Sequence, residues 1–280
     1  MEYSVITPAK NEGHHIEMTL SSMANQTIKP QEWIILDDYS SDDTKEKILP
    51  YIDRYEWIIY KLANPKTHSD YSSRVVEIFN FGFSLLIEKP EIIVKLDADV
   101  SFPPEFFENI LREFETNPKL GIASGHLTLN GLPEEHKYGS LSTRGATKCY
   151  RLECLREIGG VVPAISWDTI DNAGARAKGW QTRTLPYYFE HLKEEGSRAG
   201  SYLKNHFRTG ISNGSIPYYF PYFILKIMLH SKDRPIIIGS IVQLAGYIKS
   251  RFVIRYRPFP AFASRQVRKE QRDFIRSLLK

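Results

Sequence analysis

The sequence predicts an α/β fold, in which a mostly parallel sheet is flanked by helices and followed by a C-terminal helical extension. Short apolar strands alternate with amphipathic helices over the first hundred residues, as in parallel sheets covered on both faces. Polar clusters follow several of these strands, and from about residue 216 the sequence becomes aromatic, apolar and basic. With 280 residues, of which 42% are hydrophobic, the chain can bury a sizeable core.

The first hundred residues divide into alternating elements. We expect strands at 3–7, 31–36, 56–61 and 92–96, and helices at about 15–25, 45–51 and 74–87. Ile16, Leu20 and Met23 have near-helical spacing, which supports the first helix. No G-x-G-x-x-G follows the first strand and no G-x-x-x-x-G-K-[ST] occurs, which disfavours the dinucleotide-binding and P-loop versions of the architecture.

Polar clusters at 8–13, 37–43 and 97–101 each follow a predicted strand. In a parallel sheet these positions share the carboxyl edge, where ligands collect. Asp97 and Asp99 are separated by one small residue, so strand alternation directs both carboxylates toward the same side, within reach of one hard divalent cation. Asp-x-Asp alone is more typical of a solvated turn. The three clusters together favour a metal and phosphate site.

Five segments occur in a specific order over roughly residues 3–110. They are 6–12 (ITPAKNE), 20–30 (LSSMANQTIKP), 34–44 (IILDDYSSDDT), 80–82 (NFG) and 97–99 (DAD). This order resembles family 2 glycosyltransferases, enzymes with the GT-A fold of the nucleotide-diphospho-sugar transferase superfamily. A looser match, Trp167–Asp171 with Gly179 and Trp180 behind it, resembles the acceptor-side acidic motif of the family.

The resemblance implies an inverting, metal-dependent transfer of a sugar from a nucleoside diphosphate sugar, a UDP- or GDP-sugar, to a glycan or lipid-linked acceptor. The segment 245–247 (AGY) with the preceding 234–235 (RP) resembles the tails of bacterial enzymes of cell-surface polysaccharide or glycoconjugate biosynthesis. Asp97 and Asp99 would hold Mg²⁺ or Mn²⁺. His191, 23 residues after Asp168, is a further candidate ligand, with a structural role as the alternative. Asp168 is the expected base for the acceptor hydroxyl, and Asp171 is the competing candidate.

The resemblance also assigns donor binding to loops at the sheet edge. We expect backbone contacts from residues 7–9, ribose contacts from Glu12, a base N–H bound by Asp38, and Arg74 near the diphosphate. The complete expected donor set is Thr7, Pro8, Ala9, Glu12, Asp38, Arg74, Asp97 and Ala98. Alternatively, Glu12 caps a helix, Asp38 forms an Asx turn and Arg74 is a solvated arginine at the start of a helix.

Two positions depart from the family pattern in the donor loops. Lys10 stands where many relatives have tyrosine or phenylalanine. Tyr39 replaces the common glycine or asparagine of the Asp-Asp-x-Ser turn. Both departures concern donor specificity more than the fold.

We expect a catalytic domain at 1–215, with a nucleotide-sugar half at about 1–110 and an acceptor half at about 111–215, and a helical segment at 216–280. Tyrosines among aliphatic residues, followed by lysines and arginines, suit the headgroup zone of a bilayer. A helical subdomain covering the acceptor face is the alternative. The apolar run Ile236–Ile248 is too short to span a bilayer.

Charge, the first residues and the cysteines limit the possible class and location of the protein. The formal net charge of +4 does not indicate a nucleic-acid binder. The first residues lack the pattern of a signal peptide, so a cytoplasmic enzyme is expected, with peripheral attachment to the cytoplasmic face of the membrane through the basic segment. Cys149 and Cys154 are expected as reduced, buried thiols on one helical face.

Two other functions are compatible with part of the pattern. A nucleotidyltransferase acting on sugar phosphates also holds a metal and a nucleotide with carboxylates at strand ends, but the loop after the first strand has one lysine and no run of glycines. A non-catalytic glycan-binding relative is disfavoured because Asp97, Asp99 and Asp168 are all present.

Overall fold

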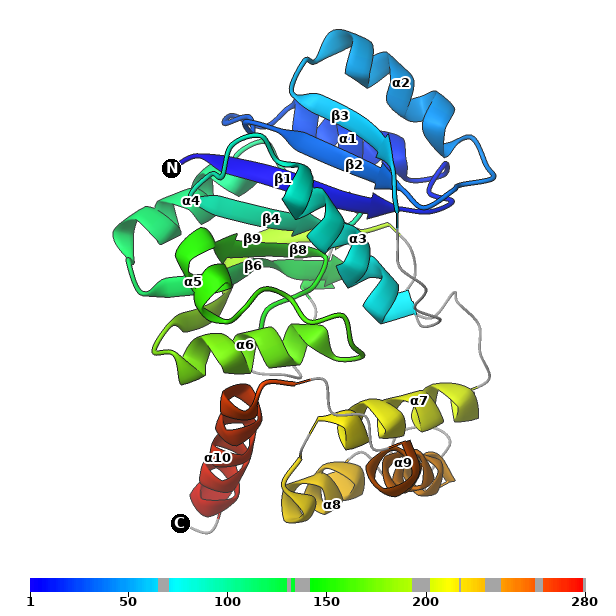
Figure 1. Ribbon diagram of the computed structural model, residues 1–280, viewed down its shortest axis with the longest axis vertical. Helices are drawn as coiled ribbons and strands as arrows, with labels where there is room; N and C mark the ends of the chain where they lie inside the picture. Colours follow the sequence, from blue (N-terminus) through cyan, green and yellow to red (C-terminus); the bar gives the residue numbers. More distant parts are fainter. Residues whose placement is uncertain are drawn as a thin grey trace.

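A computed structural model describes residues 1–64, 71–129, 132–133, 142–192, 202–216, 218–229, 238–254 and 259–278. Within these residues one sheet runs through the molecule (Figure 1). Its strand order is β3 (Ile58–Leu62), β2 (Trp33–Asp37), β1 (Tyr3–Ala9), β4 (Ile92–Leu96), β8 (Thr147–Arg151), β6 (Leu120–Leu129), β9 (Gln181–His191) and β5 (Val100–Ser101), and β7 (Leu132–Pro133) pairs with β6. The first four strands in that order are parallel, β6 and β9 are parallel, and β8 is antiparallel to both its neighbours. The expected mostly parallel sheet is confirmed.

Helices cover both faces of this sheet because successive strand residues point to opposite faces. The helices of this part are α1 (Ile16–Ala24), α2 (Thr44–Arg54), α3 (Tyr71–Leu85), α4 (Phe106–Thr116), α5 (Leu152–Glu157) and α6 (Trp167–Ala177). Val5 packs in one core with residues of α1, α2 and α4, whereas Ile6 packs in a second core with residues of α3, α5 and α6. The strands lie within two residues of the expected bounds, and α3 begins at Tyr71, three residues before the expected start.

The helices after the sheet are α7 (Tyr202–Ser215), α8 (Phe220–Leu229), α9 (Ile238–Ile248), the π-helix η1 (Lys249–Ile254) and α10 (Ala261–Leu278). Figure 1 shows them at the end of the molecule opposite α2. The last of them, α10, returns to α6, where Arg176 donates two hydrogen bonds to the Glu270 carboxylate at 2.6 and 2.8 Å. In contrast, α7 packs chiefly against α9 and η1, although it precedes residue 216. Among the described helices, none is both long and apolar enough to cross a membrane.

The expectation that the two cysteines share a helical face is wrong. Cys149 lies on β8, which pairs with β4 and β6, and the chain turns into α5 only at Leu152, so that Cys154 alone is helical. Both thiols are free and buried, as expected, and burial raises the pKa of each.

Candidate active site

Strand pairing brings the three expected metal ligands together. Asp97 follows β4, Asp99 precedes β5, and His191 ends β9, which pairs with β5 through the Val100 and His191 positions. One ligand atom from each of the three side chains lies within 4.8 Å of the others, and His191 Nε2 is 3.6 Å from Asp99 Oδ1. Two carboxylates and an imidazole suit a divalent ion such as Mn²⁺ or Mg²⁺. These residues therefore fit a divalent cation.

Sequence reasoning missed a lysine at this site. The Lys95 ammonium donates a hydrogen bond to Asp97 Oδ1 and is nearly buried, whereas the Asp97 side chain is 29% exposed. The contact follows from strand alternation, because residues two apart point to the same face. A charged residue inside the otherwise apolar strand Ile92–Leu96 is the signal that could have identified it. One of the carboxylates proposed to bind metal thus already has a cationic partner.

The turn that carries the two aspartates is anchored by α1. The Thr19 hydroxyl contacts the carbonyl oxygens of Ala98 at 2.9 Å and Val100 at 2.8 Å. Ala98 is itself buried, so any donor contact from it would come from its backbone. The Asp97 N–H donates to the Ala146 carbonyl at 2.8 Å, which fixes the other side of the turn. Both aspartates are therefore presented by a rigid backbone.

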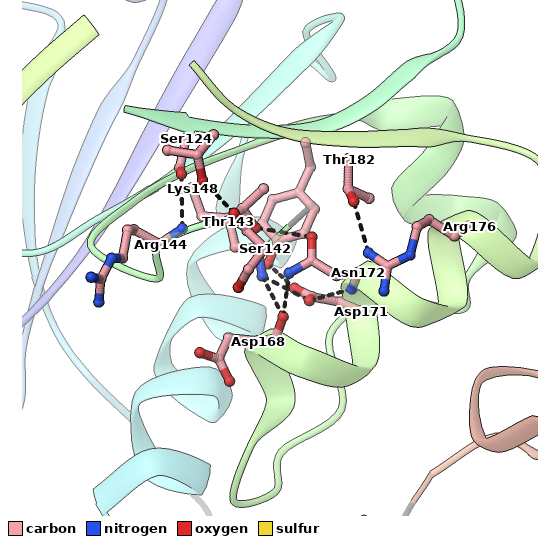
Figure 2. Close-up of polar contacts among 12 residues, drawn as sticks. Ser124, Ser142, Thr143, Arg144, Lys148, Asp168, Asp171, Asn172, Arg176 and Thr182 are labelled. Carbon is pink, nitrogen blue, oxygen red and sulfur yellow. Dashed lines mark hydrogen bonds and ion pairs between the residues drawn. The ribbon is translucent and has the colours of Figure 1, made fainter. Parts of the chain in front are cut away.

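The two candidate bases on α6 have different surroundings (Figure 2). The Asp171 carboxylate points into a buried cluster, where it accepts hydrogen bonds from Lys148 Nζ at 2.7 Å and the Tyr150 hydroxyl at 2.5 Å. Burial raises the pKa of the Asp171 carboxyl, and the Lys148 ammonium opposes that shift. The half-buried Asp168 carboxylate points away from the cluster and, among the described residues, has no hydrogen-bond or ion-pair partner. Asp168 thus remains available to an acceptor hydroxyl.

The backbone of Asp168 is held by the same cluster. Its carbonyl accepts from Lys148 Nζ at 2.9 Å and from the Asn172 side-chain amide at 2.5 Å. Asn172 in turn accepts from the Thr143 hydroxyl at 3.0 Å. The buried cluster therefore fixes the first turn of α6 and the position of Asp168.

Trp167 links the metal side of the site to the base side. Its ring covers Lys148 Nζ at 5.0 Å and Lys95 Nζ at 5.6 Å from the ring centroid, distances typical of cation–π contacts. Lys95 and Lys148 are direct cross-strand partners on β4 and β8, so their side chains lie on one face of the sheet. The strands thus bring Asp97 and the start of α6 to one region of the sheet.

Two of the expected donor residues contact each other. Arg74 of α3 donates to both oxygens of the Asp38 carboxylate, at 2.6 Å from Nε and 2.5 Å from the terminal nitrogen. Lys10 Nζ lies 3.3 Å from the same carboxylate. Asp38 is buried and Arg74 is partly exposed. A base N–H bound by Asp38 would therefore share an acceptor that already contacts two cationic side chains.

The remaining expected donor residues line the carboxyl end of β1. Thr7 and Ala9 are buried and Pro8 is half-buried. The Thr7 hydroxyl accepts a hydrogen bond from Trp33 Nε1 at 2.8 Å. The contact expected between Thr7 and the nucleotide sugar would therefore come from the Thr7 backbone. The Glu12 carbonyl accepts from the backbone N–H groups of His15 and Ile16 at the start of α1.

The backbone conformation at Tyr39 explains why glycine or asparagine is common at this position. Its φ is 57°, in the left-handed region that strains a residue with a large side chain. The Tyr39 side chain is 62% exposed, so this strain is accepted at a solvent-facing position beside the donor loops.

Residues 4–163 match the model of glycosyl transferase family 2, which is more than half of the chain. The chain belongs to glycosyl transferase family 2. It is accordingly a glycosyltransferase, and the sheet is the GT-A fold that the motifs indicated. The matched range includes Asp97 and Asp99 and ends before Asp168 and His191. A search of curated proteins gave no match.

Solved structures with the same fold share little sequence with this chain. S. aureus TarS residues 1–349 in complex with UDP-GlcNAc has a TM-score of 0.61 and 17% identity, with 99% of this chain and 92% of that chain covered. The mannosyltransferase PcManGT from Pyrobaculum calidifontis, in complex with GDP-Man and Mn²⁺, has a TM-score of 0.56 and 15% identity, covering 99% and 75%. The match to a longer S. aureus TarS structure has a TM-score of 0.54 and 16% identity and covers 90% of this chain and 44% of that one. At these identities the likeness establishes the fold.

Proposed function

We propose that this glycosyltransferase moves a sugar from a nucleoside diphosphate sugar to a glycan or lipid-linked acceptor, with inversion at the anomeric carbon. The observation that carries the proposal is the convergence of Asp97, Asp99 and His191 at the carboxyl edge of the sheet. That edge is where ligands bind in open α/β sheets. The UDP-GlcNAc in TarS and the GDP-Man with Mn²⁺ in PcManGT support a UDP- or GDP-sugar donor here.

In this proposal Asp97, Asp99 and His191 hold a divalent cation, Mg²⁺ or Mn²⁺. Such an ion supplies positive charge to the diphosphate as it leaves. The rigid Asp97 to Asp99 turn holds two of the ligands in a fixed geometry, and Thr19 anchors that turn. Lys95 provides a resident positive charge next to Asp97.

Asp168 is proposed as the base that takes the proton of the attacking acceptor hydroxyl. Its carboxylate is half-buried and faces away from the Lys148 cluster, so a substrate hydroxyl can reach it. Asp171 is less suited, because Lys148 and Tyr150 already occupy its oxygens. The Trp167 ring next to Asp168 offers an apolar face for a sugar ring.

The donor set proposed for the nucleotide comprises Thr7, Pro8, Ala9, Glu12, Asp38, Arg74, Asp97 and Ala98. We also propose the division into a catalytic domain at 1–215 and a helical segment at 216–280. The two buried free thiols suit a reducing compartment, which supports a cytoplasmic enzyme. We propose that it works in cell-surface glycan synthesis, attached to the membrane surface through the C-terminal segment.

Donor binding by the purified chain tests the metal assignment. Thermal unfolding is measured with UDP or GDP, each with Mn²⁺, Mg²⁺ or EDTA. A nucleoside diphosphate is expected to raise the unfolding temperature only when a divalent ion is present, because an ion held by Asp97, Asp99 and His191 would supply the positive charge that attracts the phosphates.

The matched variants are Asp99→Ala and Asp273→Ala, which remove a carboxylate from the site and from the exposed surface of α10. Asp99→Ala is expected to abolish the metal-dependent shift and to lower donor turnover at least about a thousandfold. Asp273→Ala should behave like the wild type. Near-normal turnover in Asp99→Ala would exclude the metal assignment.

A further inference from the structure

The helix α9 and the π-helix η1 have an unusual distribution of side chains. Their buried positions are Gly239, Gln243, Gly246, Tyr247 and Ser250, which are mainly small or polar residues. Their outward positions include Ile238, Ile241, Ile248 and Phe252, with 55%, 60%, 47% and 63% exposed area. A helix on the surface of a globular protein normally has the opposite arrangement, with its apolar face toward the core.

The exposed apolar residues form one stripe. Ile238, Ile241, Ala245, Ile248 and Phe252 follow one another at intervals of three or four residues, which places them on one side of the helix. Val253 and Ile254 extend the apolar surface at 72% and 45% exposure. We call Ile238, Ile241, Ala245, Ile248 and Phe252 the outer stripe. Each residue of this stripe is exposed in the part of the chain that the structure describes.

The opposite side of α9 packs against α7 almost backbone to backbone. A Cβ at Gly246 would lie 2.3 Å from the Phe207 carbonyl oxygen, and a Cβ at Gly210 would lie 2.0 Å from that of Gln243. A Cβ at Gly214 would lie 2.7 Å from the Tyr247 carbonyl oxygen. Small residues between closely packed helices, with large apolar residues outside, are the arrangement found where the surroundings are lipid.

The sequence in and around α9 and η1 carries charges of one sign. Between Asp233 and Glu270 the sequence has no aspartate or glutamate and eight basic residues, which are Arg234, Lys249, Arg251, Arg255, Arg257, Arg265, Arg268 and Lys269. Lys249 and Arg251 lie within the span of the outer stripe itself. Anionic lipid headgroups attract such residues at roughly 1 kcal/mol each near the surface. The charge is therefore complementary to an anionic bilayer.

We propose that the outer stripe inserts into the headgroup and acyl boundary of an anionic bilayer, with α9 lying in the plane of the membrane. An eleven-residue helix is about 16 Å long, shorter than the roughly 30 Å of a bilayer core, so it lies in the interface and does not span it. A second copy of this chain is a poorer occupant, because a twofold contact would bring Lys249 and Arg251 of both copies together with no acidic residue nearby in the sequence.

This inference deepens the membrane contact included in the proposed function and rests on it for its role. It places the enzyme where a lipid-linked acceptor would be found. Figure 1 shows α7, α8 and α9 beyond α6, on the side of the sheet away from α2. The outer stripe thus belongs to the part of the molecule nearer to α6, which carries Asp168.

The test is sedimentation of the full chain with phosphatidylcholine vesicles and with vesicles that also contain phosphatidylglycerol, without donor or acceptor. The double variant Ile241→Ser/Phe252→Ser removes apolar area from the stripe, and Ile87→Ser is the matched control, because Ile87 is an 83% exposed apolar residue after α3. We expect binding to the anionic vesicles to weaken about tenfold or more in the double variant and to stay unchanged in Ile87→Ser.

A second pair of variants tests the charges. Lys249→Ser/Arg251→Ser is expected to lose the preference for anionic vesicles, whereas Lys269→Ser on α10 should retain it. Raising the salt concentration should weaken binding of the wild type toward that of the charge variant.

Equal vesicle binding by the wild type and the double variant, or no binding by the wild type, would overturn the proposal. So would a dimer in sedimentation velocity that the double variant abolishes, since a second copy would then cover the stripe. The metal-dependent nucleotide shift is measured on the same variants and is expected to be unchanged. Loss of vesicle binding with that shift intact separates this inference from the transferase assignment.

Discussion

Two lysine–aspartate pairs lie side by side beneath Trp167 and differ in their access to solvent. In the first, the Lys95 side chain is 5% exposed and that of Asp97 is 29% exposed. In the second, Lys148 and Asp171 are 0% and 2% exposed, and Asp171 also accepts from Tyr150. Lys95 and Lys148 are cross-strand neighbours and are both nearly buried. The two pairs therefore differ in the solvent exposure of their aspartates.

Because of this difference in exposure, Asp97 can exchange its cationic partner, whereas Asp171 cannot. Asp97 follows β4 at the ligand edge of the sheet, beside Asp99 and His191, and can accept a divalent cation in addition to Lys95. Asp171 is buried between α6 and the sheet. Removing its partner Lys148 would leave a buried carboxylate without a compensating cation. The open pair is therefore suited to binding, and the sealed pair is suited to holding the backbone of Asp168.

The largest expected effect distinguishes the two aspartates of α6. Asp168→Asn is expected to lower sugar transfer about a thousandfold, equivalent to about 4 kcal/mol, because the acceptor hydroxyl loses its base. Binding of the nucleoside diphosphate, measured by calorimetry, should be unchanged. If Asp168→Asn transfers sugar normally while a folded Asp171→Asn does not, the assignment of roles is reversed.

The next effect is on stability and concerns the sealed pair. Lys148→Met leaves the Asp171 carboxylate buried without its cation and is expected to cost about 3 kcal/mol of unfolding free energy. Denaturant unfolding measures this loss. A loss of unfolding free energy below about 1 kcal/mol would show that other groups stabilise the Asp171 carboxylate without Lys148. The two pairs would then not differ in the way described above.

The smallest effect belongs to the open pair. Lys95→Met is expected to cost less than about 1 kcal/mol, because the partly exposed Asp97 can be solvated when its partner is removed. It should also tighten Mn²⁺ binding, since a competing cation leaves Asp97. Parallel unfolding curves and Mn²⁺ titrations in the presence of UDP test both statements. Weaker Mn²⁺ binding would mean that Lys95 orients Asp97 for the metal.

Local pattern was sufficient for most of the first hundred residues. The strands at 3–7 and 92–96 and the polar clusters after them follow from short apolar runs and their endings, which depend on neighbouring residues only. Cys149 was misassigned because a strand and a helix meet at Leu152, and spacing alone does not distinguish one helix from such a junction.

The sequence by itself determined the alternation of strands and helices, the Asp97-Ala98-Asp99 turn and the family, because each is carried by residues close together in the chain. The tertiary structure decided which distant residues meet. His191 reaches Asp99 only because β9 pairs with β5, and Asp168 differs from Asp171 only because β8 brings Lys148 and Tyr150 under α6. Burial and long-range pairing arise from packing of the whole chain, which a local pattern does not contain.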